Sequence, residues 1–117
     1  MKVKFHQLRI WKEGYELLME IYQISAAFPL HEKYSLTSQI TRSANSVIAN
    51  IAEAHGRYYY ADRVRVFYIA RAEIQETQSH LRVALGLNYV SKVKFDELNY
   101  RYEGLKIGIC KYINSLK

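Results

Sequence analysis

The chain has 117 residues, enough to bury one hydrophobic core without disulfide or metal support, so a single domain is expected over residues 1–117. Half of the residues are hydrophobic and 24% are charged, and no stretch approaches the ~18 apolar residues that a membrane span needs. The formal net charge of +6 directs long-range encounters toward polyanions such as nucleic acids, although the same charge also serves solubility.

The cysteine content and the N-terminal region both bear on the cellular compartment. Cys110 is the only cysteine, so neither an internal disulfide nor a zinc motif with two cysteines can form. The first lysines are followed by Arg9, Lys12 and Glu13 in place of an apolar stretch, so we expect no secretion signal. These features predict a cytoplasmic protein without a membrane partner.

The first periodic segment predicts a helix over about residues 7–28. Pro29 ends it, because proline lacks an amide hydrogen and pushes the preceding residue toward extended geometry. Apolar residues recur at alternating steps of three and four, flanked by further apolar positions, while charged residues occupy the other side. The expected wide stripe consists of Leu8, Trp11, Tyr15, Leu18 and Tyr22, with Ile10, Gly14, Leu17, Ile21, Ile24 and Phe28 beside them.

A second helix is predicted over residues 35–55, with Ser35 as N-cap and Gly56 in the left-handed conformation after its end. Between Ser35 and Ala52 the only charged residue is Arg42, and the remainder is aliphatic, small or polar. A helix that faces water usually carries charge on one side, so this composition indicates contact on more than one face. The second contact is either another chain or another helix of a closely packed bundle.

Two further helices are predicted over residues 61–87 and 92–115, and the first of these should be the longest in the chain. Gly86 and Asn88 suit its end, and Ser91 suits the N-cap of the last helix. Short connections make helices that are neighbours in sequence antiparallel, so the expected fold is all-α, an antiparallel up-down-up-down four-helix bundle. The last helix has the most regular stripe: Phe95, Leu98, Tyr102, Leu105, Ile109, Tyr112 and Leu116.

The sequence carries no motif that is typical of metal binding or catalysis. Di-metal bundles use Glu-x-x-His pairs, which this sequence lacks, and Glu76 with His80 is better interpreted as a surface contact. There is no glycine-rich phosphate loop and no Gly-x-Ser-x-Gly turn, and Cys110 is expected to be partly buried. The sequence therefore predicts a protein that is not an enzyme, with no metal, cofactor or small-molecule substrate.

Several motifs, taken in order along the chain, resemble the four-helix-bundle proteins encoded in intervening sequences of bacterial 23S ribosomal RNA genes. The resemblance covers nearly the whole chain. It departs from the family pattern at Ile48, where proline is common, at Ala54, where glycine is common, and at Ala72-Glu73, where Gly-Ser is usual. The matching motifs are the segment 5–11 with Trp11, Phe28-Pro29, then Glu32, Tyr34, Leu36, Gln39 and Arg42, Asn50-Ile51-Ala52-Glu53, Ile69-Ala70-Arg71 and Glu76.

The resemblance implies a non-enzymatic homo-oligomer, typically a pentameric ring, that binds nucleic acid through a basic surface. Relatives serve as accessory partners of reverse transcriptases in diversity-generating retroelements, so a nucleic-acid-processing protein is a second kind of partner that the resemblance implies. If the second helix forms the oligomer interface, its polar residues must satisfy one another there, because each unpaired buried polar group costs about 1–3 kcal/mol. These expected interface residues are Gln39, Arg42, Ser46, Asn50 and Glu53.

Arginines and tyrosines are concentrated around the junction of the second and third helices and along the third helix. Arginine binds phosphate in a bidentate manner and tyrosine stacks on unpaired bases, so the mixture suits single-stranded or looped RNA. Alternatively, some of the tyrosines 58–60 close the end of the bundle, and the arginines pair with Asp62 and Glu73 or Glu76. The candidate RNA-binding residues are Arg57, Tyr58, Tyr59, Arg63, Arg65, Arg71, Arg82 and Lys94.

Overall fold

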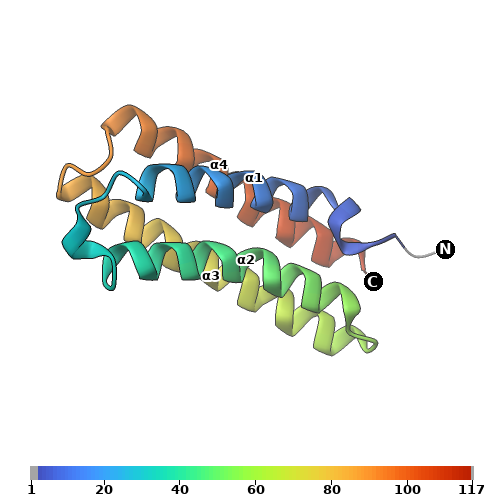
Figure 1. Cartoon of the computed structure of the whole chain (residues 1–117). Coiled ribbons are helices and arrows are strands. Elements are labelled where there is room, and N and C mark those ends of the chain that lie inside the picture. The colour runs from blue at the N-terminus through green and yellow to red at the C-terminus, as the bar shows by residue number, and fades with distance from the viewer. Residues whose placement is uncertain (1–2, 117) are drawn as a thin grey trace.

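Four long helices and two short 3-10 turns make up the computed structural model, which describes residues 3–116. Helix α1 packs against α2 and α4, and α3 packs against α2 and α4, so the helices form a ring in sequence order. Successive helices run in opposite directions (Figure 1). Because residues 3–116 contain no strand, the predicted all-α up-down-up-down bundle is confirmed. The elements are η1 Phe5–Gln7, α1 Arg9–Ser25, η2 Leu30–Glu32, α2 Leu36–Gly56, α3 Tyr60–Gly86 and α4 Lys92–Ser115.

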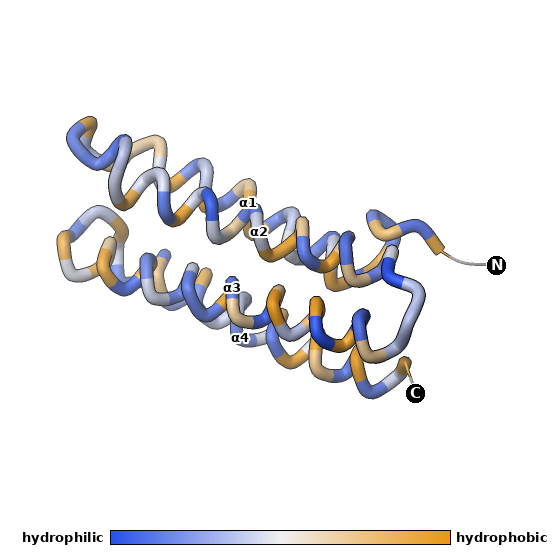
Figure 2. Tube along the Cα trace, turned by 90° about the horizontal axis from the view of Figure 1, so that it is seen from below, coloured by the Kyte–Doolittle hydropathy of each residue, from blue (hydrophilic) through white to orange (hydrophobic). Residues whose placement is uncertain are grey.

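The core is built from apolar residues that recur every three or four positions, and hydrophobic and hydrophilic residues alternate along each helix (Figure 2). The predicted stripe of α4 is buried from Phe95 through Ile109, whereas Tyr112 and Leu116 are only half-buried. Each fully buried aliphatic or aromatic side chain contributes about 1.5–3 kcal/mol to folding. The fully buried residues include Leu17, Ile21, Ile40, Val47, Ile51, Phe67, Ile74, Leu81, Leu98, Tyr102 and Ile109.

The buried side of α1 is the aliphatic part of the predicted apolar stripe. Leu8 and Leu18 are buried as predicted, and so are the flanking Ile10, Leu17 and Ile21. The prediction was wrong for Tyr15 and Tyr22, which are 44% and 51% exposed, because the stripe is wider than the face of α1 that the neighbouring helices cover. The aromatic residues form a chain of contacts on the surface. In that chain the Trp11 ring lies 5.3 Å from Tyr15 and 5.4 Å from Phe5.

Helix α1 is also shorter than the predicted 7–28. It begins at Arg9 because Leu8 is extended (φ −68°, ψ 134°), and it ends at Ser25. Beyond Ser25 the backbone forms turns with hydrogen bonds between residues three apart, in which the Ala27 and Phe28 amides donate to the carbonyls of Ile24 and Ser25. Pro29 restricts Phe28, the residue directly before it, and so prevents the helix from continuing, whereas α1 already ends three residues earlier at Ser25.

The other helix bounds agree with the predicted ranges within one residue, and α3 is the longest helix, as predicted. Asn88 has the left-handed φ of 63°, and the Ser91 hydroxyl accepts a hydrogen bond from the Lys94 amide at 3.1 Å. Ser35 is the N-cap residue of α2, as predicted, but its side chain makes no capping hydrogen bond, and the Glu32 carboxylate accepts the Leu36 amide at 3.2 Å. The predicted left-handed conformation of Gly56 is wrong, since no described glycine has a positive φ.

The two connectors at one end of the bundle are tied together. The Tyr89 hydroxyl donates to Glu32 at 2.9 Å, and the hydrogen bonds from Tyr89 and then Leu36 lower the pKa of the Glu32 carboxyl. The chain termini and the turn between α2 and α3 lie at the opposite end (Figure 1). There His55 Nε2 lies 2.6 Å from the Val3 carbonyl oxygen, which attaches the N-terminal segment to α2.

Candidate nucleic-acid interface

The turn between α2 and α3 carries an exposed pair of aromatic rings. Arg57 leaves the helix in an extended conformation, and Tyr58 and Tyr59 follow it with 88% and 68% of their surface exposed. Their rings meet edge to face with centroids 5.0 Å apart. Because Tyr60 is exposed as well, the alternative in which the tyrosines close the end of the bundle is wrong. The rings are accessible to a ligand.

The arginines of α3 form no ion pair with the described residues 3–116. Among residues 3–116, the arginines in ion pairs are Arg9, Arg42, Arg57 and Arg101, and none of them lies on α3. The alternative to RNA binding, in which these arginines pair with Asp62 and Glu73 or Glu76, is therefore not found in this part of the chain. Arg63 is half-buried, whereas Arg65, Arg71 and Arg82 are exposed.

The predicted residues do not form one compact patch. At about 100° per residue, Arg71 and Arg82 lie on the same side of α3, while Arg65 is rotated by roughly 120° from Arg71. At 1.5 Å per residue, Arg82 is roughly 35 Å along the helix from the tyrosine turn. A ligand that touches both Arg82 and the tyrosine turn must extend along α3.

Lys94 belongs to a different surface of the bundle. Its ammonium donates to Glu20 of α1 at 2.7 Å and lies 3.6 Å from Glu97, so its charge is already paired. The hydrogen bond to Glu20 raises the pKa of Lys94. The structure therefore brings Lys94 together with acidic residues and not with the other predicted RNA-binding residues.

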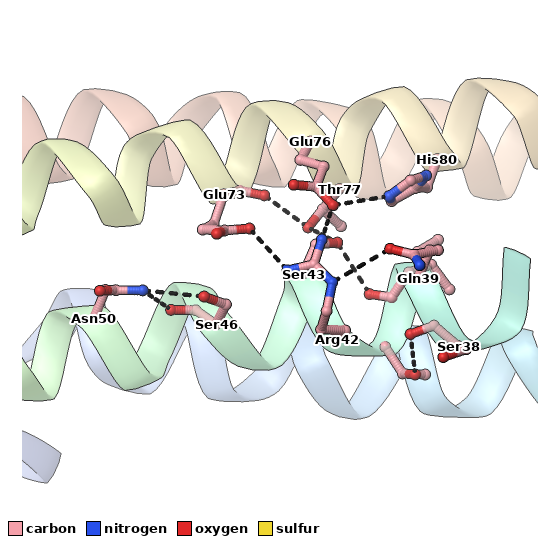
Figure 3. Close-up of polar contacts among 12 residues, drawn as sticks. Ser38, Gln39, Arg42, Ser43, Ser46, Asn50, Glu73, Glu76, Thr77 and His80 are labelled. Atoms are coloured by element: carbon pink, nitrogen blue, oxygen red, sulfur yellow. Dashed lines mark hydrogen bonds and ion pairs between the residues drawn. The ribbon is translucent and has the colours of Figure 1, made fainter. Parts of the chain in front are cut away.

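Glu73 and Glu76 of α3 are neutralised from the neighbouring helix (Figure 3). Arg42 of α2 pairs with Glu76 and lies 3.6 Å from Glu73, and Glu76 also contacts His80 at 3.1 Å, which was predicted as a surface contact. Burial and, after it, the positive charge of Arg42 lower the pKa of His80. Because Arg42 occupies the carboxylates of Glu73 and Glu76, the arginines of α3 remain available to a ligand.

The polar residues predicted at the oligomer interface are also paired within the protomer. Arg42 Nε donates to Gln39 at 3.3 Å, and the Asn50 amide donates to the Ser46 carbonyl at 2.8 Å (Figure 3). Glu53 accepts from Arg57 at 2.8 Å. The row of polar side chains on α2 therefore needs no second chain to satisfy it.

A polar furrow between α3 and α4 was missed in the sequence. Its central residue, Gln78, stands among apolar positions of α3, and this break in the apolar pattern was the available signal. The partner side chains come from α4 and depend on how the two helices are aligned, which the sequence does not give. The furrow is lined by Gln75, Gln78, Ser79, Arg82, Asn99, Glu103 and Lys106.

Within residues 3–116 there is neither a metal-binding cluster nor a membrane-spanning helix. No group of three or more His, Cys, Asp or Glu side chains is placed to hold a metal ion. Similarly, none of the helices in that range has the length and apolar character needed to cross a membrane. Cys110 is half-buried, as predicted from its place beside the apolar stripe of α4.

Fold and surface together define a basic, antiparallel four-helix bundle. The chain belongs to the 23S rRNA-intervening sequence protein family, which matches residues 6–110. It is also similar to a crystal structure of a protein with unknown function from the S23 ribosomal protein family of Bacteroides thetaiotaomicron. That match has a TM-score of 0.82 and 23% sequence identity, covering 90% of this chain and 95% of the other, so it concerns the fold alone. No curated protein matches the chain.

Proposed function

We propose that this protein is a non-enzymatic, oligomeric RNA-binding bundle that contacts RNA along α3 and at the turn preceding it. The observation that carries the proposal is the absence, within residues 3–116, of a carboxylate partner for Arg65, Arg71 and Arg82. Unpaired guanidinium groups can bind phosphate without first breaking an ion pair, and the net charge of +6 favours encounter with RNA.

The tyrosine turn favours single-stranded or looped RNA over a regular duplex. Bases in a duplex are stacked on one another and hidden from flat side chains, whereas unpaired bases can stack on tyrosine. Each base that stacks on an aromatic ring contributes about 1–3 kcal/mol. Tyr58 and Tyr59 present rings of this kind beside Arg57.

The test is a filter-binding titration with a looped RNA over a range of salt concentrations. Binding should weaken steeply as salt rises, because each phosphate contact to a single strand adds about 0.7 to the slope of log affinity against log salt. An Arg65→Gln, Arg71→Gln, Arg82→Gln triple variant should lower that slope by about 2. No salt-sensitive association at 50 mM salt would refute the proposal.

A control with the same change in net charge isolates the effect of position. Arg9, Lys12 and Lys33 are exposed and lie outside α3, so their triple replacement by glutamine removes three charges elsewhere. Equal losses of affinity in the two triple variants would mean that only net charge matters. A larger loss in the α3 variant is the expected result.

Self-association is the second part of the proposal. Tyr15, Met19 and Tyr22 of α1 are exposed, and on the neighbouring helix α2 the exposed Asn45 and Ala49 are uncharged. A second copy of the chain would cover this surface, and the family resemblance suggests a pentamer. Light scattering at micromolar concentration should give several times the protomer mass, and a monomer would overturn this part. Ala49→Arg should lower the mass, whereas Ser79→Arg on α3 should not.

A protein-interaction scaffold is the alternative function. A groove of about 770 Å³ lies between α1 and α4, and Tyr100 and Ile107 beside it are 79% and 56% exposed. Under this alternative the charge serves solubility or attracts an acidic protein. Replacing Arg57, Arg63 and Arg65 by Glu distinguishes the two functions, because it abolishes RNA binding but spares a partner held in the groove.

A further inference from the structure

The furrow between α3 and α4 has the size of a small binding site. Its volume is about 330 Å³, at the lower end of the ~300–1,000 Å³ typical of ligand pockets, so it has room for one flat ring system rather than a large cofactor. Its side chains come from successive turns of both helices. All of them bear amide, hydroxyl or charged groups, which are suited to hydrogen bonding.

Gln78 at the base of the furrow is held in one orientation. Its side chain is only 8% exposed, and its amide nitrogen donates to Asn99 Oδ1 at 3.1 Å and to Glu103 Oε2 at 2.8 Å. Because both partners are acceptors, the amide cannot be reversed without losing both bonds. Within residues 3–116, neither the Gln78 carbonyl oxygen nor the Asn99 amide nitrogen has a hydrogen-bond partner, which leaves one acceptor and one donor for a ligand.

The acid in the furrow is already balanced. Lys106 lies 2.6 Å from Glu103 and donates to Gln75 at 2.9 Å, and the bonds from Lys106 and then Gln78 lower the pKa of Glu103. The pair has no net charge and does not by itself repel a phosphate chain.

Arg71 and Arg82, which form no ion pair with a carboxylate of residues 3–116, lie along the same side of α3 as the furrow. The Arg82 guanidinium rests on the Phe95 ring, 5.1 Å from its centroid, which positions it at the furrow without a carboxylate. Arg71 lies eleven positions earlier on the same side, about 16 Å away at 1.5 Å per residue. In a stacked strand that distance spans about five phosphates at 3.4 Å each.

We infer that the α3–α4 furrow takes one unpaired base of a single-stranded RNA. Gln78 and Asn99 read its Watson–Crick edge, and Arg71 and Arg82 hold phosphates along the strand. The inference rests on the proposed RNA-binding function and adds a specific subsite to it. Every Watson–Crick edge places a donor beside an acceptor, and it is free for the furrow only when the base is unpaired.

The test compares a 12-nucleotide single-stranded RNA with the same strand lacking its bases. Asn99→Ala and Gln78→Met should each weaken binding of the intact strand about fivefold or more, since a bidentate base contact gives about 1–3 kcal/mol of discrimination. Both variants should bind the abasic strand as the unaltered protein does. Arg71→Gln with Arg82→Gln should weaken both strands and lower the salt slope by about 1.4.

Gln23→Met and Asn114→Ala are matched controls, because these residues are exposed and lie outside the furrow. Asn99 is only half-buried, so its variant keeps the test valid if Gln78→Met fails to fold. Equal binding of the intact strand by Asn99→Ala and the unaltered protein would overturn the subsite and leave RNA binding intact. A loss that also extends to the abasic strand would exclude base reading. If the unaltered protein binds neither strand, the proposed function itself fails.

Discussion

Gly14 provides a test of how closely α1 and α2 pack. A Cβ atom added at Gly14 would lie 2.6 Å from the Ile48 Cγ2 methyl, whereas one added at Gly104 of α4 would meet nothing within 4 Å. Both glycines lie inside helices, and neither has a positive φ. The two alanine variants therefore share the same backbone change and differ in their packing.

The expected magnitudes follow from two opposing effects. Replacing glycine by alanine inside a helix stabilises it by about 0.8–1.0 kcal/mol. Forcing a methyl group into a packed core costs about 1–3 kcal/mol. Gly104→Ala should thus raise the free energy of unfolding by about 1 kcal/mol, and Gly14→Ala should lower it by about 1 kcal/mol.

Urea unfolding followed by circular dichroism, at one protein concentration, measures both variants. The difference of about 2 kcal/mol corresponds to roughly 8 °C in the melting temperature of a domain near 100 residues. Gly108→Ala should fall between the two, because its Cβ would lie 3.4 Å from Ile10. If Gly14→Ala were as stable as Gly104→Ala, α1 and α2 would not be as close as described.

Two further predictions concern contacts made by α3. The buried hydroxyl groups of Ser43 and Thr77 are hydrogen-bonded at 2.8 Å. A double-mutant cycle of Ser43→Ala and Thr77→Val, measured by urea unfolding, should therefore give a coupling free energy of about 0.5–1.5 kcal/mol. Additive losses of stability would contradict this prediction. His80 has a pKa below its usual 6.5 in the fold, so the unfolded chain takes up its proton first as pH falls. The stability that the neutral His80 imidazole contributes is therefore complete above pH 6.5 and falls progressively as the pH drops below that value. His80→Gln should therefore narrow the difference in urea midpoint between pH 7.5 and 5.5, and an unchanged difference would exclude His80 as a source.

The candidate site was only partly predictable. The repeat of 3.6 residues per turn was enough to place Arg71 and Arg82 on one side of α3. It could not reveal that Arg42 neutralises Glu73 and Glu76, because these residues lie far apart in the sequence and meet only through the packing of α2 on α3. Nor could it reveal that Lys94 is paired with Glu20 of α1.

The amino-acid sequence by itself determined the number of helices, their approximate ends and the antiparallel topology. These features depend on local spacing, on Pro29 and on short connections, all of which act over a few residues. Only the tertiary structure decided which side of α1 is buried, because an apolar stripe wider than one contact face offers two choices, and close packing beside Gly14 selects the aliphatic one. The structure likewise decided which charges stay free, since ion pairing depends on neighbours brought together by the fold.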